Sequence, residues 1–352
     1  MFYNCSSLIS LDLSNFDTSK IIYINTLFFQ CRALKSLNLA NFNTTQMKNM
    51  ALMFYQCSSL NSLNLLMFDT SKVECMALMF YECYSLTLLN ISSFNTSVVT
   101  DMESMFEGCS NLTSLDLRNF DTTKVLYLDY MFGSCLSLIS INISSFNIKN
   151  AVSMEGIFFG CSSLTSIDLS NFGISKVKTT ESMFQGCSIL KMINLSNFYT
   201  LQVSNMDNMF YNCINLEYIN LHNLLIQSNN IHMDDIFSLT KINLVVCAKD
   251  EILINKTKEN ICAIIDCSDN WRENRKKIIV ENNTCVDNCS LVFDSFEYES
   301  KCYKNCSFGG YNYINFDSEN NLYINCTYSL EGFYHIINDF ILLFKINKFF
   351  IL

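Results

Sequence analysis

Hydrophobic and polar residues follow a strict 26-residue pattern over the first two thirds of the chain. Cysteine recurs at this interval without insertion or deletion, and phenylalanine and leucine recur with it, starting at Phe2 and Leu8. The nine cysteines of the series are Cys5, Cys31, Cys57, Cys83, Cys109, Cys135, Cys161, Cys187 and Cys213. A fixed period of this length indicates a repeat protein, in which each unit buries its apolar side against its neighbours.

Each repeat contains two patterns that predict secondary structure. Residues 10–14 alternate between polar and apolar side chains, which predicts a short strand with one buried face. Leu8, Leu11 and Leu13 add the L-x-x-L-x-L spacing of leucine-rich repeats. Later in the unit, as over residues 99–106, apolar residues lie three and four positions apart, which predicts a short helix. The expected fold is therefore an α/β repeat solenoid whose strands form one parallel sheet, about 4.8 Å apart.

The repeat unit reads M-F-x-x-C-x-S-L-x-S-L-[DN]-L-S-x-F-[DN]-T-S-x-V-x-x-M-x-x, and residues 7–21 follow its central string with isoleucine in place of the valine. In period and sequence this unit resembles the BspA-like leucine-rich-repeat surface proteins, which are built from the bacterial surface protein 26-residue repeat. The resemblance covers residues 1–224. It implies a cell-surface or secreted binding protein, of the kind discussed as adhesins, and it does not imply an enzyme.

The repeat register fails after Cys213, and the chain divides into four predicted segments. Residues 1–224 hold nine repeats, the first of them entered partway through a unit. Residues 225–246 are a shortened capping coil, because the L-x-x-L-x-L spacing returns there after 23 residues and atypical units cap solenoids. Residues 247–330 form a cysteine-rich module, and residues 331–352 are a hydrophobic tail.

Both ends of the sequence lead us to expect a chain that continues further. Met1 falls within a repeat unit, with no signal sequence before it. Residues 340–352 are mostly apolar but include Lys345 and Lys348, whereas a helix that spans a membrane needs about 20 apolar residues. We expect the tail either to pack on the cysteine-rich module or to be the truncated stub of a membrane segment, through which the protein would associate with a membrane.

The repeat cysteines and the module cysteines are expected to differ in chemistry. Stacked cysteines in a solenoid place their Cβ atoms nearly a strand spacing apart, whereas a disulfide needs about 3.8 Å. The repeat cysteines are therefore predicted to be buried free thiols. The module holds an even number of cysteines, which predicts a disulfide framework in an oxidising compartment. The candidates are Cys247, Cys262, Cys267, Cys285, Cys289, Cys302, Cys306 and Cys326.

Two C-x3-C pairs in the module leave zinc open as an alternative, because their spacing is near that of zinc ligands. The strings C-V-D-N-C and K-C-Y-K-N-C also resemble the cysteine-rich modules of growth-factor-receptor ectodomains and protozoan surface proteins. Those modules usually carry proline after the second cysteine, where this chain has Ser290 and Ser307. Disulfides are the prediction, and no metal ligand is assigned.

The polar positions of the predicted strand form the candidate ligand-binding face. Its central column is Asp12, Asn38, Asn64, Asn90, Asp116, Asn142, Asp168, Asn194 and Asn220. No two Asp residues of the column fall on adjacent repeats, and like charges on neighbouring strands are destabilising, so the order is first a folding constraint. A regular array of polar groups also suits a glycan or an extended peptide. Calcium is an open alternative, although one Asp per coil supplies few of the six to eight oxygens that calcium takes.

Composition and charge remove several functional classes. Acidic residues outnumber basic ones by 33 to 23, giving a net charge of −10, so the basic surface that nucleic-acid binding requires is missing. Neither G-x-G-x-x-G nor G-x-x-x-x-G-K occurs among the nine glycines. Of the three histidines, His222 is expected on the strand face with no cysteine beside it, and His232 and His335 in irregular segments. No enzyme, catalytic residue, cofactor or metal is predicted.

Two functional hypotheses follow from the sequence. The first is a non-enzymatic surface or secreted recognition protein that binds protein or glycan ligands on a host, a neighbouring cell or the matrix. The second is an intracellular leucine-rich-repeat scaffold, which would need the module cysteines to be reduced or zinc-bound. Acceptors of the N-x-S/T type favour export; they begin at Asn90, Asn95, Asn111, Asn142, Asn194, Asn282, Asn288, Asn305 and Asn325.

Overall fold

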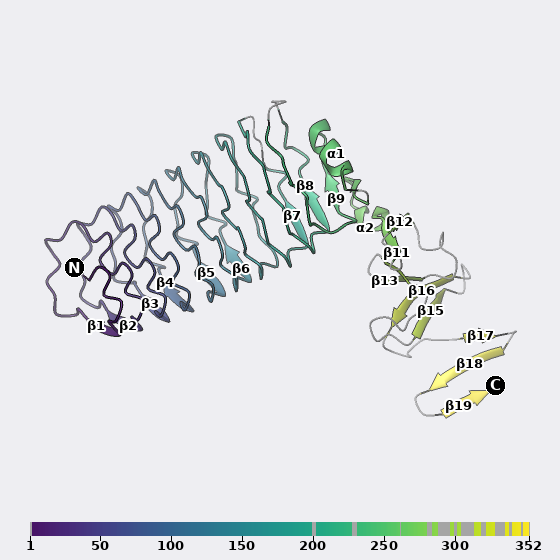
Figure 1. Cartoon of the computed structure of the whole chain (residues 1–352), viewed down its shortest axis with the longest axis horizontal. Helices are drawn as coiled ribbons and strands as arrows, with labels where there is room; N and C mark the ends of the chain where they lie inside the picture. Colours follow the sequence, from purple (N-terminus) through teal and green to yellow (C-terminus); the bar gives the residue numbers. More distant parts are fainter. Residues whose placement is uncertain are drawn as a thin grey trace. The chain divides into compact units, whose positions relative to one another are not determined.

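A computed structural model gives the structure of the chain, which divides into two compact units (Figure 1). Unit 1 comprises Met1–Lys241 and Val246–Glu259, and unit 2 comprises Ile242–Val245 and Asn260–Leu352. The described residues are 2–198, 202–226, 231–260, 262–279, 284–287, 296–298, 301–303, 313–317, 322–327, 335–337, 340–345 and 348–351. All of the 26-residue repeats lie in unit 1.

The coils of unit 1 carry short parallel strands, which confirms the predicted solenoid (Figure 1). The strands are β1 (Ser10–Asp12), β2 (Ser36–Asn38), β3 (Ser62–Asn64), β4 (Leu88–Asn90), β5 (Ser114–Asp116), β6 (Ser140–Asn142), β7 (Met192–Asn194) and β8 (Tyr218–Asn220). Pairs lie in register one repeat apart, as Leu11 opposite Leu37 and Leu115 opposite Ile141. The coil between β6 and β7 has no assigned strand, but Thr165 N still donates to Ile139 O of the preceding coil (3.1 Å).

A second line of backbone contacts runs along the same coils. Single residues of successive coils form parallel bridges, from Tyr23 opposite Asn49 to Asn205 opposite His232. The bridge partners lie 26 residues apart except at the last bridge, where Asn205 and His232 are 27 apart. The coil after the ninth repeat therefore continues the stack with a one-residue change of register.

The short helix predicted in each repeat is wrong, because none of residues 99–108 is helical and residues 103–108, like the equivalent described residues of the other repeats, form turns. The backbone N–H groups of these turns alternate between two acceptors. Met105 N donates within its coil to Met102 O (3.3 Å), whereas Phe106 N donates to Met131 O of the next coil (3.0 Å). A helix requires every N–H to bond four residues back. The apolar residues still face the core, so their spacing resembles that of a helix.

Each of these turns contains two residues with a left-handed backbone, four positions apart. In one turn they are Ser104 (φ 51°) and Gly108 (φ 75°). We call the six residues that end at the second of them a turn segment. The turn segments are residues 25–30, 51–56, 77–82, 103–108, 129–134, 155–160, 181–186, 207–212 and 234–239. A left-handed residue interrupts a helix, and glycine directly before the repeat cysteine, at Gly108, Gly160 and Gly186, is the sequence signal for this turn.

Identical side chains stack along the core of unit 1. The phenylalanine rings from Phe2 to Phe237 stack with neighbouring centroids 5.5–5.9 Å apart. Beside them, each cysteine from Cys31 to Cys213 donates its S–H to the carbonyl oxygen of the phenylalanine 29 residues earlier, at 3.0–3.3 Å. All of these cysteines are free and buried, as predicted.

A buried threonine in each of the first four coils adds a second side-chain link between coils. The hydroxyl of Thr96 donates to Asp121 O (2.9 Å) and accepts from Asp121 N (2.8 Å). Thr18, Thr44 and Thr70 make the same two bonds to the coil that follows each of them. One hydroxyl thus satisfies both backbone polar groups of a residue in the next coil, as buried polar groups require.

Strand β9 (Val245–Cys247) and helix α1 (Glu251–Lys258) follow the coils. Leu221 N donates to Cys247 O (2.8 Å), which continues the backbone ladder of the coils. The helix begins after Asp250, whose carboxylate accepts from the N–H groups of Ile252 and Leu253. This N-cap satisfies two of the backbone donors that a helix leaves unpaired at its start.

The described part of unit 2 consists mainly of short strands. Its elements are β10 (Ile264–Ile265), α2 (Trp271–Asn274), β11 (Lys277–Ile279), β12 (Thr284–Val286), β13 (Phe296–Tyr298), β14 (Lys301–Tyr303), β15 (Tyr313–Asp317), β16 (Leu322–Thr327), β17 (His335–Ile337), β18 (Phe340–Lys345) and β19 (Lys348–Ile351). One sheet has the order β12-β11-β14-β13, β15 pairs with β16, and the third sheet is β17-β18-β19. Among the described residues, neither helix is long and apolar enough to span a membrane.

Replacing Thr96 with valine should lower the free energy of unfolding by about 1–3 kcal/mol, because valine keeps the shape of threonine but leaves the N–H and C=O of Asp121 unpaired. Thr96→Ser is the matched control, since it keeps the hydroxyl and loses only a methyl group. Denaturant unfolding of both variants measures the difference. Equal destabilisation of the two variants would show that the hydroxyl is not the stabilising group.

Alkylation of the native protein at neutral pH should modify Cys5 and Cys75 before the buried cysteines from Cys31 to Cys213. Burial raises the pKa of the buried thiols, to about 12 for Cys83 and Cys213, and a protonated, enclosed thiol is unreactive. Mass spectrometry of peptides, after alkylation with and without denaturant, identifies the modified residues. Labelling of Cys83 at the rate of Cys75 would contradict the buried ladder.

Candidate functional site

The candidate ligand-binding column lies in one line along the solenoid, at the last residue of each strand and, for Asp168, at the equivalent position of the coil without an assigned strand. Register pairs Asp12 with Asn38 and Asp116 with Asn142 on neighbouring coils. The side chains are exposed in every coil except the last, where Asn220 is partly exposed. The structure therefore brings all nine sequence-derived candidates to one surface, and their binding role stays a prediction.

Every side chain in this column is fixed by its own backbone. The Oδ1 atom accepts a hydrogen bond from the N–H two residues ahead, at 3.1 Å from Ser144 N in the case of Asn142. The same bond spans 2.9–3.4 Å across the nine coils. This is an Asx turn. It leaves the second polar atom of the side chain, Nδ2 in Asn and Oδ2 in Asp, at a set position on the surface.

A second column of alternating Asp and Asn makes the same local bond. Asn95 Oδ1 accepts from Ser97 N (3.1 Å), and Asp121 Oδ1 accepts from Thr123 N (2.9 Å). Hydrogen bonds of this kind favour the ionised carboxylate. The bond from Ser14 accordingly holds the pKa of Asp12 below its ordinary value. These Asp residues therefore contribute to local structure whether or not a ligand binds them.

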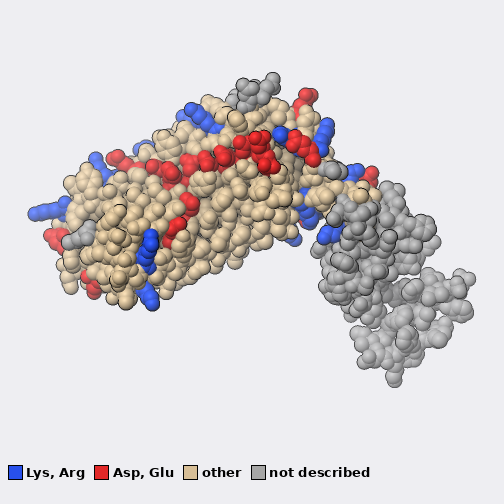
Figure 2. Space-filling model, in the orientation of Figure 1, with Lys and Arg blue, Asp and Glu red and all other residues tan. Residues whose placement is uncertain are grey.

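A line of acidic residues that the sequence patterns did not single out crosses six consecutive coils. We call it the acidic stripe, and it consists of the first residue of six turn segments (Figure 2). Its members are Glu103, Asp129, Glu155, Glu181, Asp207 and Asp234. The nine turn segments contain no Lys or Arg. The recurrence of acidic residues at one position of the repeat is a signal that the sequence contains. Because these positions were assigned to a helix, their alignment by the turns was not predicted.

Burial and like charge work against ionisation in the acidic stripe. Burial raises the pKa of Glu103, and the carboxylates of Asp101 and Asp129 raise it further. Burial also raises the pKa of Asp129, although its Oδ1 accepts from Ser153 Oγ and from Glu155 N (2.9 Å). Stacked carboxylates therefore cost stability at neutral pH. This is the reverse of the candidate column, where Asp never follows Asp.

The cysteine-rich region holds disulfides in its described part, as predicted. Cys262 pairs with Cys285, and Cys247, Cys267 and Cys302 are also disulfide-bonded. Because Cys285 and Cys302 belong to the two C-x3-C pairs, their oxidation removes the thiolates that the zinc alternative needs. The side chains of the remaining candidates, Cys289, Cys306 and Cys326, lie outside the described part of the structure.

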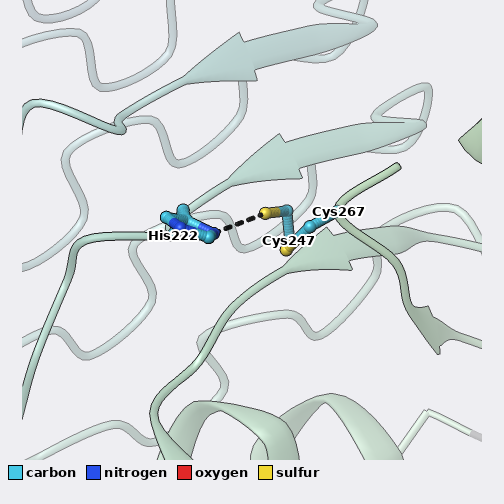
Figure 3. Close-up of side chains that lie close together, drawn as sticks. All are labelled: His222, Cys247 and Cys267. Carbon is cyan, nitrogen blue, oxygen red and sulfur yellow. Dashed lines mark hydrogen bonds between the residues drawn. The ribbon is translucent and has the colours of Figure 1, made fainter. Parts of the chain in front are cut away.

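The prediction that no cysteine lies beside His222 is wrong. His222 Nδ1 lies 3.6 Å from Cys247 Sγ, as Figure 3 shows. The contact escaped prediction because the coil is one residue longer than a repeat, not shortened to the expected 23-residue spacing, so that β9 lies beside β8 at an offset of 27 residues. Since Cys247 is disulfide-bonded, it provides no thiolate for a metal ion.

Stability should be greatest in mild acid, because two sets of carboxylates titrate in opposite directions. The pKa values of Glu103 and Asp129 are raised in the folded state. Their protonated forms therefore stabilise the fold, and this stability is lost as pH rises above about 4–5. The pKa values of Asp12 and Asp116 are lowered in the folded state. Their ionised forms therefore stabilise the fold, and this stability is lost as pH falls below about 4. The midpoint of thermal unfolding, measured between about pH 3 and pH 8, should therefore be highest in mild acid.

Glu103→Gln/Asp129→Asn is the variant that isolates the first effect. It should flatten the decline of the unfolding midpoint between about pH 5 and pH 8 and leave the acid side unchanged. A midpoint that rises steadily to about pH 8 in the unmodified protein would show that the acidic stripe does not destabilise the fold.

Comparison with known proteins assigns the repeats to a family, whose model does not match the cysteine-rich region. A family model described as "Mycoplasma protein of unknown function, DUF285" matches residues 1–114, 63–167 and 129–243. The matches end at residue 243, so the resemblance of the cysteine-rich region to growth-factor-receptor modules stays a prediction. No curated protein matches the chain.

Two solved structures are similar to the chain. A leucine-rich cell surface protein from Faecalibacterium prausnitzii A2-165 has 18% identity and a TM-score of 0.30, over 62% of this chain and 68% of that chain. A leucine-rich repeat protein from Bacteroides ovatus ATCC 8483 has 18% identity and a TM-score of 0.25, over 71% of this chain and 85% of that chain. Because the family model covers more than half of the sequence, the chain belongs to the repeat family described as DUF285.

Proposed function

We propose that the protein is a non-enzymatic recognition protein of the cell surface or the extracellular space, which presents the Asn/Asp column to protein or glycan ligands. The observation that carries the proposal is the set of nine side chains, one per coil and all exposed except the partly exposed Asn220, each fixed by an Asx turn. Side chains that are already ordered lose little further entropy when they bind a ligand.

The spacing of the column suits an extended ligand. Coils repeat at about 4.8 Å, so nine side chains offer a row of hydrogen-bonding groups about 38 Å long. Most of the strand positions two residues before the column are serine, as at Ser36, Ser62 and Ser114, and these side chains are exposed. The surface therefore favours ligands with many hydroxyl or amide groups, such as glycan chains or an extended peptide.

The disulfides support an extracellular location. Cys262 pairs with Cys285, and three further described cysteines of this region are oxidised. Structural disulfides persist in oxidising compartments and are rare in the cytosol. An intracellular scaffold, the alternative, would require these cysteines to be reduced.

Thiol counting on protein from its native host should find all eight cysteines beyond residue 246 paired and the ten repeat-region cysteines free. Alkylation without reduction, followed by mass spectrometry, measures this count. Free thiols at Cys262 and Cys285 would instead favour the intracellular scaffold.

Asn142→Asp should weaken ligand binding about tenfold or more, because it replaces the outward amide with a carboxylate, and a lost hydrogen bond plus an unfavourable charge costs this much. The variant retains the Oδ1 acceptor for Ser144 N. Asn95→Asp, in the second column, is the matched control. It retains the bond to Ser97 N, places a carboxylate between two Asp residues as Asn142→Asp does, and removes an N-x-S acceptor in the same way.

Binding of both variants to a glycan array and to immobilised matrix proteins measures the effect. A ligand of the unmodified protein should bind Asn95→Asp normally and Asn142→Asp weakly. If the two variants bind alike, the Asn/Asp column is not the recognition surface.

A further inference from the structure

The first turn segments carry a strip of stacked aromatic side chains on the surface. The rings of Tyr3, Phe29, Tyr55 and Tyr81 lie with neighbouring centroids 4.6–4.8 Å apart and planes within 6° of parallel. Tyr3 is 58% exposed, and the other three are partly exposed. Since each ring covers the face of the next, the rings leave a continuous row of aromatic edges, three of them tyrosine, which we call the aromatic strip.

Polar groups beside the aromatic strip are already paired with one another. Gln30 Nε2 donates to Gln56 Oε1 (2.8 Å), and Gln56 Nε2 donates to Glu82 Oε2 (2.6 Å). Leu52 and Leu78 occupy left-handed positions of the same turn segments and are partly exposed. The first three turn segments therefore present mainly aromatic and aliphatic groups, together with the tyrosine hydroxyls.

The acidic stripe begins in the turn segment that follows the aromatic strip. Tyr81 is the last ring of the strip, and Glu103 is the first carboxylate of the stripe. From Glu103 to Asp234 there are five coil-to-coil steps, which is about 24 Å at about 4.8 Å per coil. None of the six stripe carboxylates forms an ion pair within the described residues.

These two features share one surface but have opposite chemistry. A partner can cover the apolar area of the aromatic strip. The acidic stripe is a line of like charges whose mutual repulsion destabilises the fold. A cationic partner would relieve that repulsion. The acidic stripe therefore favours a partner with positive charge, and the exposed aromatic edges favour a partner with large apolar side chains.

We propose that the turn segments, together with Tyr3, bind an extended protein segment in which a few large apolar residues are followed by a run of Lys and Arg. At about 3.3 Å per residue, about seven extended residues would span the acidic stripe. The surface is distinct from the Asn/Asp column, so this proposal does not depend on the function proposed above.

Three synthetic peptides of equal length test the proposal by fluorescence anisotropy on the full chain. The first has Phe and Leu residues followed by six lysines, the second replaces the apolar residues with serine, and the third alternates the residues of the first. The two-block peptide should bind at least tenfold more tightly than the other two. Equal affinity of the two-block and serine peptides would overturn the role of the aromatic strip.

Charge variants test which carboxylates are involved. Glu103→Gln/Glu155→Gln/Glu181→Gln should weaken binding of the two-block peptide about tenfold and reduce its salt dependence. The matched control, Asp12→Asn/Asp116→Asn/Asp168→Asn, removes the same charge from the Asn/Asp column and keeps its Asx turns. Equal loss in the two triple variants would mean that net charge alone attracts the peptide, which would overturn the proposal.

Apolar variants test the other half of the surface. Tyr3→Ser, at the open end of the aromatic strip, should weaken the two-block peptide several-fold and leave the serine peptide unchanged. Leu88→Ser, an exposed apolar residue on β4, is the control and should change neither. Unfolding midpoints near that of the unmodified protein show that each variant is folded. A Tyr3→Ser variant that is folded and binds the two-block peptide normally would contradict the proposal.

Discussion

Hydrogen bonds from the backbone of one coil to the backbone of the next hold the solenoid in register. In the turn segments, alternate N–H groups leave the local turn and donate to the following coil, as Phe106 N does to Met131 O. A residue inserted within a turn segment would break such pairs, and this constraint is consistent with the invariant spacing of 26 residues. The one-residue change occurs only between Asn205 and His232, where the coils end.

The side chains in the core follow from this register. Because the backbone repeats from coil to coil, side chains at equivalent positions lie next to one another, and each must pack against a neighbour of the same type. Phenylalanine rings do so by stacking, cysteine thiols by donating to carbonyl groups, and the hydroxyl of Thr96 by bonding both polar groups of Asp121. Free thiols suit this position because their volume is small and their buried pKa keeps them unreactive.

Charge is distributed differently on two surfaces of the same coils. The Asn/Asp column interrupts its carboxylates with amides, so local Asx turns form without repulsion between adjacent coils. The acidic stripe places a carboxylate in every coil from Glu103 to Asp234, and the pKa values of Glu103 and Asp129 are raised mainly by burial and further by neighbouring carboxylates. The first surface is compatible with folding. The second is a cost to folding, and we therefore connect it with a partner.

The sequence by itself determined the repeat, the core columns, the strand at residues 10–12 and the free state of the stacked cysteines, because a fixed period dictates which side chains must meet. Only the tertiary structure decided the rest. Residues 99–108 have the apolar spacing of a helix, but bonds to the next coil and left-handed residues at Ser104 and Gly108 make residues 103–108 turns. The same turns align the acidic stripe, and the changed register brings Cys247 to His222. These outcomes depend on contacts between coils, which no single repeat contains.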